Sequence, residues 1–311
     1  MAGSLVSGPA AGNAETRCGF VALIGAPNAG KSTLVNRLVG TKVSIVSHKV
    51  QTTRSMVRGI AMIGRSQIVF VDTPGIFKPK RRLDRAMVDT AWGGARDADI
   101  VALLIDAGKG IDDQAEALLS RLGDVRHPKV LLLNKIDTVK RERLLALADA
   151  ASKAVNFERI FMISALNGDG LDAFTGFLAA AVPAGPFLYP EDEVSDIPLR
   201  QLAAEITREK LFERLHQELP YHATVETEAW TDQKNGSARV EQTIYVERES
   251  QKKIVIGKAG ATIKAISMAA RKEISEIAEK PIHLFLFVKV RENWADDPER
   301  YRAMGIEFPK G

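Results

Sequence analysis

The chain has 311 residues, of which 45% are hydrophobic and 26% charged, and its formal net charge is +4. This length is sufficient for two packed domains, and no apolar run approaches the ~20 residues of a membrane span. Cys18 is the single cysteine, which excludes a disulfide framework and a cysteine-rich metal site. We expect Cys18 to be a small core residue.

Residues 1–16 are small and polar, with neither an apolar signal core nor an Arg-rich amphipathic pattern. We therefore expect a flexible N-terminal tail without a targeting peptide, and the cytoplasm as the compartment.

A phosphate loop is predicted between an apolar run at 20–24 and a helical pattern at 32–39. A strand, a glycine-bounded loop and a helix in this order are typical of phosphate binding, because the loop and helix N–H groups face the anion. We expect Lys31 to reach the β- and γ-phosphates and the Ser32 hydroxyl to ligate Mg²⁺. The loop residues are Gly25, Ala26, Pro27, Asn28, Ala29, Gly30, Lys31 and Ser32.

Two further segments complete the phosphate side. Residues 46–54 are polar and loop-like, and either Thr52 or Thr53 can close over Mg²⁺ and the γ-phosphate; we favour Thr53. Asp72 ends a buried strand and can hold Mg²⁺ through water. Gly75 can offer its N–H to the γ-phosphate, so that loss of this phosphate would release the segment after it. The residues of this second motif are Asp72, Thr73, Pro74, Gly75 and Ile76.

The base-reading motifs follow two more apolar strands. The Asp137 carboxylate can accept N1–H and N2–H₂ of guanine, whereas adenine would leave it unpaired at a cost of several kcal/mol. Asn134 braces the loop, the Lys135 stem covers the base, and backbone N–H groups after Ser164 lie near guanine O6. The residues are Asn134, Lys135, Ile136, Asp137, Ser164, Ala165 and Leu166. Together the ordered motifs specify GTP.

The glutamine that orients the attacking water in Ras-type GTPases is absent, because Ile76 stands at that position. The chain therefore either hydrolyses GTP slowly or positions water by another route. Asn28 either helps to hold a K⁺ ion beside the phosphates or only shapes the loop, and both interpretations remain open. The predicted catalytic residues are Lys31, Thr53, Gly75 and Asn28, and the predicted metal-binding residues are Ser32, Thr53 and Asp72.

A proline-rich, acidic linker separates this domain from a second one. A closing helix is predicted over 171–182, before the linker, and a helix over 199–219, stopped by Pro220, after it. Two β-rich runs at 222–230 and 239–248 are joined through Asn235-Gly236, which is a hairpin signal.

Gly257-Lys258-Ala259-Gly260 then lies between two helical patterns, the second reaching Glu279, and a last strand is predicted at 283–290. Helix, strand, strand, helix, Gly-x-x-Gly, helix and strand is the layout of the bacterial (type II) KH fold, whose loop clamps single-stranded nucleic acid. Residues 251–272 hold six cations and no acid, which favours RNA binding over a solvated helix pair. The predicted RNA-binding residues are Lys252, Lys253, Ile256, Gly257, Lys258, Ala259, Gly260, Lys264 and Arg271.

The predicted fold class is α/β followed by α+β. It comprises a tail (1–16), a phosphate-loop GTPase domain with a mostly parallel sheet and helices on both faces (17–182), a linker (183–198), and a type II KH domain with a C-terminal tail (199–311).

With these residues the chain resembles the Era family of bacterial GTPases, from about Gly19 to the last strand. Beyond the nucleotide motifs, the shared segments are residues 51–54, 205–212, 218–221 and 254–260. The resemblance implies a Mg²⁺-dependent GTPase, alternating between GTP and GDP, that takes part in 16S rRNA processing and assembly of the 30S ribosomal subunit. It implies a KH domain that binds the single-stranded 3′ end of 16S rRNA. It also implies a mostly cytoplasmic protein with a peripheral fraction on the inner membrane, and we expect a monomer.

Three functions fit these observations. The leading hypothesis is an RNA-binding switch, in which GTP and GDP change how the two domains sit against each other. The second is a GTPase of cell-cycle or membrane signalling in which RNA binding is secondary. The third is an RNA-binding module that senses GTP and barely hydrolyses it.

Overall fold

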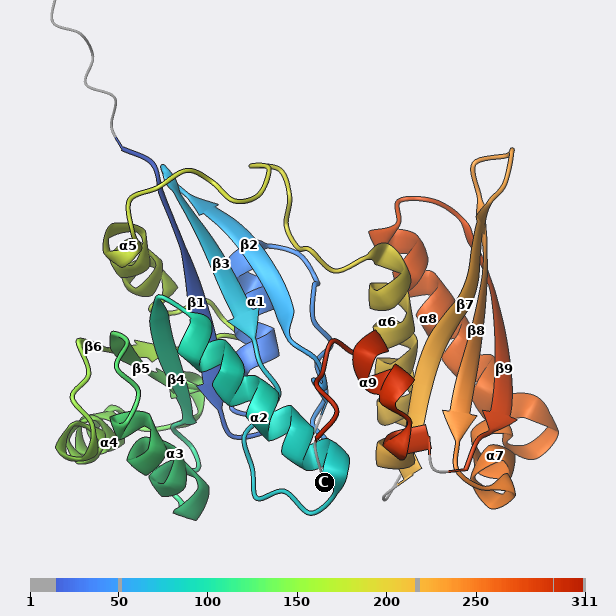
Figure 1. The fold of residues 1–311 in the computed structure, drawn as a ribbon, viewed down its shortest axis with the longest axis horizontal. Helices are drawn as coiled ribbons and strands as arrows, with labels where there is room; N and C mark the ends of the chain where they lie inside the picture. The colour runs from blue at the N-terminus through green and yellow to red at the C-terminus, as the bar shows by residue number, and fades with distance from the viewer. Residues whose placement is uncertain (1–14, 50–51, 216–218, 293, 310–311) are drawn as a thin grey trace, which may run out of the picture.

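Two sheets with their helices stand side by side in the computed structural model of the chain (Figure 1). The structure describes residues 15–49, 52–215, 219–292 and 294–309. Most of the tail predicted at 1–16 therefore lies outside the described residues, as do Gln51 and Glu218 of the Era-like segments. No helix in the described ranges is both long enough and apolar enough to cross a bilayer.

The first sheet has six strands in the spatial order β2-β3-β1-β4-β5-β6. β2 runs antiparallel to β3 and all other neighbours are parallel, which confirms the predicted mostly parallel sheet. The strands are β1 (Arg17–Gly25), β2 (Val57–Ile63), β3 (Ser66–Asp72), β4 (Ile100–Asp106), β5 (Lys129–Asn134) and β6 (Arg159–Ile163).

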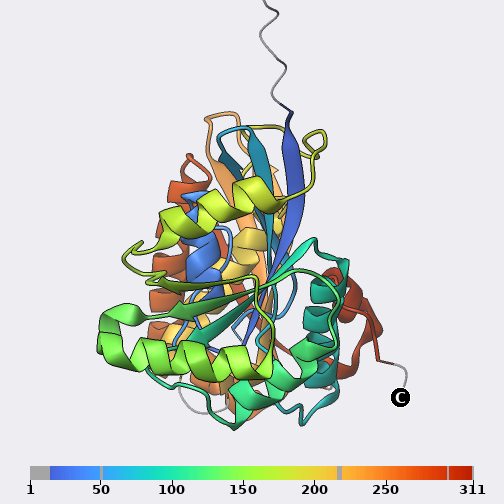
Figure 2. The ribbon, with the colours of Figure 1, turned by 90° about the vertical axis from the view of Figure 1, so that its left-hand side faces the viewer.

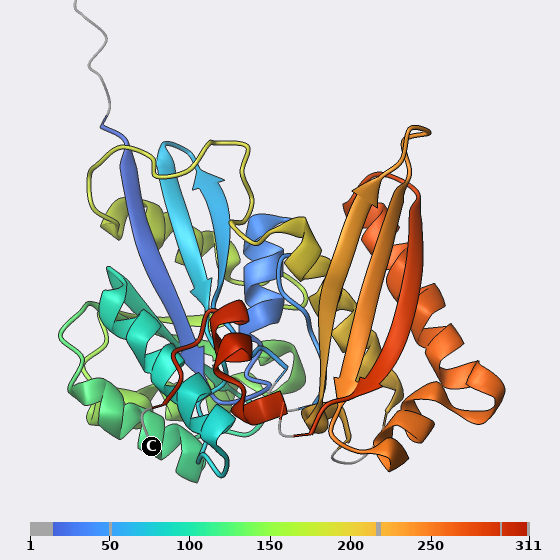
Figure 3. The same cartoon turned by 45° about the vertical axis from the view of Figure 1, so that its right-hand side comes forward.

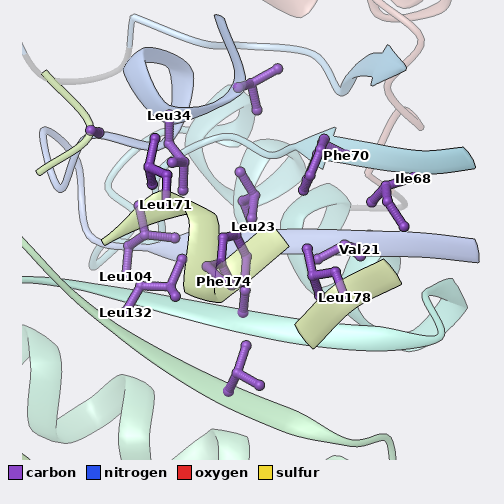
Figure 4. Close-up of a cluster of buried hydrophobic side chains, with 14 of the residues drawn as sticks. Val21, Leu23, Leu34, Ile68, Phe70, Leu104, Leu132, Leu171, Phe174 and Leu178 are labelled. Atoms are coloured by element: carbon purple, nitrogen blue, oxygen red, sulfur yellow. The ribbon is translucent and has the colours of Figure 1, made fainter. Parts of the chain in front are cut away.

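Helices cover both faces of this sheet (Figure 2), which explains why its central strands are continuous apolar runs. On one face α1 and α5 pack on the strands through residues such as Leu34 and Phe174 (Figure 4). On the other face α2, α3 and α4 enclose a second cluster. The helices are α1 (Lys31–Val39), α2 (Arg82–Asp97), α3 (Asp113–Gly123), α4 (Arg141–Ala154) and α5 (Leu171–Ala181).

The second sheet has three strands in the order β7-β8-β9, with β7 antiparallel and β9 parallel to β8. Helices pack on one face of this sheet, and the element order confirms the predicted KH layout (Figure 3). Alternate residues of β9, such as Phe285 and Phe287, are exposed. The elements are α6 (Leu199–Arg214), β7 (Ala223–Asp232), β8 (Ala238–Val246), α7 (Glu249–Ile256), α8 (Ala261–Ile277) and β9 (Ile282–Val290).

Two predicted helix ends were wrong. α6 ends at Arg214, not at residue 219, and Leu215 is already extended. The Lys49 ammonium contacts the carbonyls of Phe212 and Leu215, and a cation that binds the last carbonyls stabilises a helix end there. α8 ends at Ile277, shortly before Glu279, whose left-handed backbone (φ 51°) is incompatible with a helix.

The predicted linker at 183–198 is docked on the first domain. Its backbone forms isolated bridges to Arg17 and Gly59. The buried Gln67 side chain accepts from the N–H groups of Leu188 and Tyr189 and donates to the Tyr189 carbonyl. The connecting segment is therefore fixed to the first domain through its backbone hydrogen bonds.

The C-terminal segment, for which we predicted only a tail, contains a 3₁₀ turn at Trp294–Asp296 and helix α9 (Pro298–Ala303). Trp294 and Tyr301 are buried against Leu83 and Met87 of α2. The Trp294 indole also donates to the carbonyl of His222, 3.0 Å away, so this segment contacts both domains. Figure 3 shows α9 in front of the gap between the two sheets.

Candidate nucleotide site and nucleic-acid interface

The predicted nucleotide motifs meet at one edge of the six-stranded sheet, around a cavity of about 560 Å³. Parallel strands bring their carboxyl ends to the same edge, which is where α/β folds bind ligands. Motif residues that line the cavity are Pro27, Asn28, Gly30, Lys31, Ser32, Thr52, Thr53, Gly75, Asn134, Lys135, Asp137, Ser164, Ala165 and Leu166. The remaining motif residues do not line it: Gly25, Ala26, Ala29, Asp72, Thr73, Pro74, Ile76 and Ile136.

The phosphate loop requires glycine at both of its ends. At Gly30 the backbone is left-handed (φ 102°), and an added Cβ would lie 2.3 Å from Nδ2 of Asn134. At Gly25 a Cβ would lie 2.6 Å from the Leu104 carbonyl oxygen. The loop therefore packs directly on β4 and on the base-reading loop, and α1 begins at Lys31 with its N–H groups toward the cavity.

Lys31 is buried at the bottom of the cavity. Its ammonium donates to the carbonyls of Gly25 and Ala26, both 3.1 Å away. Burial lowers the pKa of Lys31 to about 8, although the nearby Asp72 carboxylate acts in the opposite direction. Phosphate oxygens would supply the negative charge that this buried cation lacks.

Oxygen ligands for a divalent cation gather around Asp72. Its Oδ2 accepts from the hydroxyls of Ser32 (2.6 Å) and Ser44 (2.7 Å), and Thr53 Oγ1 lies 2.9 Å from Ser32 Oγ. Burial raises the pKa of Asp72, and its Oδ1 is buried without a hydrogen-bond partner among the described residues. A carboxylate and two hydroxyls beside the phosphates fit Mg²⁺, which binds oxygen and often acts through water.

The two candidate threonines of the first switch point in different directions. Thr53 faces Ser32 in the site, whereas the Thr52 hydroxyl donates to the Lys49 carbonyl of its own loop, 2.8 Å away. Of these two hydroxyls, the one that contacts the phosphate-loop serine is that of Thr53.

Sequence reasoning missed Ser44 and its support, Asn36. The Asn36 side chain accepts from the N–H groups of Val43 and Ser44 and donates to the Ser44 carbonyl, which holds the start of the switch loop against α1. A serine within a polar loop gives no sequence signal for this role.

Asn134 joins three motifs at the base side. Its Nδ2 donates to the Ala29 carbonyl (2.8 Å), and its Oδ1 accepts from the Ala165 N–H (2.9 Å). The Lys135 ammonium donates to the carbonyl of Asn28 and forms an ion pair with Asp106, 2.7 Å away. Asp106 was not predicted, although it ends an apolar strand as Asp72 does. Asp137 is exposed at the cavity, where its carboxylate is free to accept from guanine.

The position that replaces the catalytic glutamine is unsuited to water activation. Ile76 is 8% exposed and packs with Val88 and Ala91 on the outer face of the sheet. Asn28 has a left-handed backbone (φ 64°), and its side chain donates to the carbonyl of His48, 2.7 Å away. Asn28 therefore links the phosphate loop to the switch loop.

The Gly-x-x-Gly loop connects α7 to α8 at the surface. Gly257 and Gly260 have φ values of 74° and 78°, and a Cβ at Gly257 would lie 2.2 Å from Thr262 Oγ1. Lys258 and Ala259 are both exposed at the tip. This geometry leaves room for a sugar-phosphate backbone against the loop.

A basic face continues from this loop along α8. Lys253, Lys258, Lys264 and Arg271 are exposed, whereas Lys252 and Ile256 are half-buried. Two apolar side chains that we did not predict are exposed among these cations, Ile254 (56%) and Met268 (55%). Cations beside apolar surface suit a single strand, whose phosphates and unstacked bases need both.

The switch loop also contacts the KH domain directly. The Val46 N–H donates to Glu209 of α6 (2.8 Å), and the Arg208 guanidinium donates to the Thr52 carbonyl. Lys42 forms ion pairs with Glu209 of α6 and with Glu273 of α8. The residue beside Thr53 is thus hydrogen-bonded to the domain that carries the Gly-x-x-Gly loop.

The fold and the site together define a phosphate-loop GTPase that carries a type II KH domain. Residues 20–135 match a family model described as a 50S ribosome-binding GTPase, and residues 218–295 match the KH domain. The chain is 70% identical over 301 residues to the GTPase Era of Rhizobium meliloti, covering 97% of this chain and 96% of that protein. The GTPase Era of Afipia carboxidovorans is 68% identical over 295 residues, with 95% and 96% covered. The chain belongs to the GTPase Era family, and it is a GTP-hydrolysing enzyme.

Two solved structures share the whole arrangement. Era in complex with MgGDPNP and nucleotides 1506–1542 of 16S ribosomal RNA is 38% identical, with a TM-score of 0.88 over 93% of this chain and 99% of that one. A single-residue variant of Aquifex aeolicus Era bound to GDP·AlF₄⁻ is also 38% identical, with a TM-score of 0.89 and the same coverage. The similarity therefore extends over both domains.

Proposed function

We propose that this protein is a GTP-driven switch that binds the 3′ end of 16S rRNA through its KH domain. In this proposal it acts in 16S rRNA processing and biogenesis of the 30S subunit. The observation that carries the proposal is the exposed loop at 257–260, with its basic face, on a chain whose nucleotide site contacts the same domain. The Era relative bound to both MgGDPNP and a 16S rRNA fragment supports it.

In the GTP state, Lys31 would bind the β- and γ-phosphates, and the N–H of Gly75 would bind the γ-phosphate. Ser32, Thr53 and, through water, Asp72 would hold Mg²⁺, which neutralises charge developing on the phosphates. Because Ile76 cannot orient water, the attack depends on backbone groups and on the phosphate-loop environment, and intrinsic turnover is slow.

Hydrolysis would be transmitted through the switch loop. Loss of the γ-phosphate removes the partner of Thr53, and the neighbouring Thr52 carbonyl is bonded to Arg208 in α6. A shift of this loop therefore changes the contacts of α6, which packs against α8 beneath the RNA-binding face. The two nucleotide states would in this way present the KH domain differently to RNA.

We further propose that a K⁺ ion beside Asn28 contributes to hydrolysis. Because the glutamine is missing, another group must assist the attack on the γ-phosphate, and a bound cation can do so by stabilising negative charge. Asn28 lines the cavity there. Its side chain already approaches the switch loop at His48, so a cation bound here would connect both loops to the phosphates.

The compartment we propose is the cytoplasm, with a peripheral fraction at the inner membrane, and the active form is a monomer. The resemblance to the Era family supports this assignment. Cell fractionation with detection of the native protein in soluble and salt-washed membrane fractions tests it, and an exclusively integral membrane pool would contradict it.

Sequencing of RNA crosslinked to the protein in cells tests the main proposal. We expect crosslinks concentrated at the 3′ end of 16S rRNA, with loss of these crosslinks when the loop at 257–260 is altered. Crosslinks spread over unrelated RNAs, with normal 16S processing in depleted cells, would favour a signalling GTPase instead.

A further inference from the structure

A second cavity, of about 330 Å³, lies between the two domains and away from the nucleotide site. Its walls come from the switch segment (Arg54 and Ser55), α6, the first half of β7, and the C-terminal helix α9. The volume is at the lower end of the range typical of small-molecule sites. The nucleotide site and the Gly-x-x-Gly loop lie outside this cavity, although Arg208, which lines it, also contacts the switch loop at the Thr52 carbonyl.

The cavity is lined by four arginines and only two carboxylates. Glu205 pairs with Arg208, and Glu226 pairs with Arg300, so these four charges compensate one another. The two remaining arginines form no ion pair with a carboxylate among the described residues. Arg54 donates to the carbonyls of Ala223, Pro220 and Tyr221, and Arg200 donates to those of Thr227 and Glu228. Two positive charges at this cavity therefore lack a direct ion pair within the described ranges.

Among the arginines that line the cavity, Arg54 and Arg208 are buried, whereas Arg200 is exposed. Burial, and then repulsion from Arg208, lowers the pKa of Arg54 to about 9, although the nearby carboxylates of Glu205 and Asp84 act in the opposite direction. Arg208 is 1% exposed, and its Nη1 has no hydrogen-bond partner among the described residues. A buried guanidinium N–H that has no acceptor costs free energy, and an anion in the cavity would supply that acceptor.

We propose that this cavity is a binding site for a small phosphorylated anion, either free phosphate or a phosphate monoester. Arg54, Arg200 and Arg208 would bind the phosphoryl oxygens, because guanidinium groups match phosphate geometry with paired hydrogen bonds. The hydroxyls of Ser55 and Thr224 also line the cavity and can donate to the anion. A phosphoryl group of charge near −2 balances the two unpaired arginines.

Occupancy of this site would hold the domains in the arrangement seen here. Arg54 lies next to Thr53 in the switch segment, whereas Arg200 and Arg208 belong to α6 of the KH domain. An anion bound to all three crosses the domain interface, and α9 closes the cavity through Arg300. A ligand that binds only this arrangement stabilises it by mass action.

Isothermal titration calorimetry tests the site with two probes, inorganic phosphate and glycerol 3-phosphate. The protein is first saturated with Mg²⁺ and GDPNP, so that the probes cannot enter the γ-phosphate position. We expect one bound anion per chain. Arg200→Gln should weaken binding by about tenfold or more, as expected for loss of a charge-assisted hydrogen bond. Arg200 is exposed, so the variant should retain the fold.

Arg65→Gln is the matched control, because Arg65 is exposed in the β2–β3 turn, on the first domain, and its loss removes the same charge. Equal binding by both variants, or no binding at all, would overturn the proposal. A 16S 3′-end oligonucleotide forms the third arm, and its affinity should be the same for Arg200→Gln and the control. Weaker RNA binding by Arg200→Gln alone, without binding of either small probe, would assign the cavity to RNA and overturn the small-anion site.

Discussion

At the scale of single residues, guanine selectivity rests on one exposed carboxylate in a braced loop. Asp137 lines the cavity, and the loop that carries it is fixed by the contacts of Asn134 and Lys135 with the phosphate loop. A pre-formed acceptor selects strongly against a ligand that lacks the matching donors.

Replacement of Asp137 by Asn should change the base that is bound. The amide offers a donor where guanine N2–H₂ needs an acceptor, so GTP affinity should fall by about 100-fold or more, whereas xanthosine triphosphate should gain affinity because its O2 accepts. Competition of each nucleotide against a fluorescent GTP analogue measures the two affinities. Tight binding of ATP by the unchanged protein would contradict the base assignment.

The titration of Lys31 should appear in the pH dependence of nucleotide binding. The phosphates bind the protonated amine, whose pKa in the free protein is lowered to about 8 and is raised again by bound phosphate. GTP affinity should therefore be constant below pH 8 and fall by up to about tenfold per pH unit above it. Lys31→Arg keeps its charge and serves as the control. If both proteins give the same profile, Lys31 does not titrate in this range.

Asn28 provides a residue-scale test of the proposed cation. GTP turnover should be faster in K⁺ than in Na⁺ at equal ionic strength, and Asn28→Ala should reduce the difference. Steady-state phosphate release measures both rates. Identical turnover of the unchanged protein in the two salts would leave Asn28 only the loop contact to His48.

At the scale of elements, substitutions in the α7–α8 loop can show whether this loop binds RNA or is only a turn. Its two central residues, Lys258 and Ala259, are exposed. The flanking glycines and Ala259 (φ 49°) have positive φ angles, which residues other than glycine adopt at a cost. Side chains at the tip can therefore be exchanged without filling a core position.

Replacement of Lys258 and Ala259 together by Asp should abolish binding of a single-stranded 16S 3′-end oligonucleotide, because two carboxylates would face its phosphates. A matched control is Lys234→Asp with Asn235→Asp in the β7–β8 turn, which makes the same charge change at exposed positions. Fluorescence anisotropy measures binding, and nucleotide affinity should be unchanged in both. Undiminished RNA binding by the first variant would show that the Gly-x-x-Gly sequence is only a turn and does not bind RNA.

At the scale of the whole molecule, the domain interface consists of polar and charged contacts more than of a shared core. Lys42 and Val46 of the first domain meet Glu209 and Glu273 of the second, and the main apolar clusters of the two domains are separate. The exception is the smaller cluster in which the C-terminal segment packs on α2. Polar interfaces of this kind permit relative motion of domains.

Lys42→Met should weaken the coupling between nucleotide and RNA. Lys210 still pairs with both Glu209 and Glu273, so no buried carboxylate is left without a cation and the fold should persist. The RNA affinity measured with GDPNP, divided by that measured with GDP, should move toward one. In the unchanged protein we expect this ratio to correspond to a coupling free energy of about 1–3 kcal/mol. Lys153→Met on α4, a surface lysine that pairs with Asp149, is the control. An unchanged ratio would exclude Lys42 from the coupling.

The local sequence determined the nucleotide motifs, the mostly parallel sheet and the KH element order. Each of these depends on short-range rules: apolar runs make buried strands, and glycine is needed where backbones approach closely, as Gly30 approaches Asn134. The strand predicted at 283–290 likewise corresponds to β9.

Only the tertiary structure decided which distant residues meet. The early end of α6 depends on Lys49, more than 160 residues earlier in the chain, and the roles of Ser44 and Asp106 depend on Asp72 and Lys135. The fold of the C-terminal segment depends on burying Trp294 and Tyr301 against α2. These contacts join residues with no periodic or motif relation in sequence, so their energy exists only once the chain has folded and, for Lys49 and the C-terminal segment, only once the two domains have packed together.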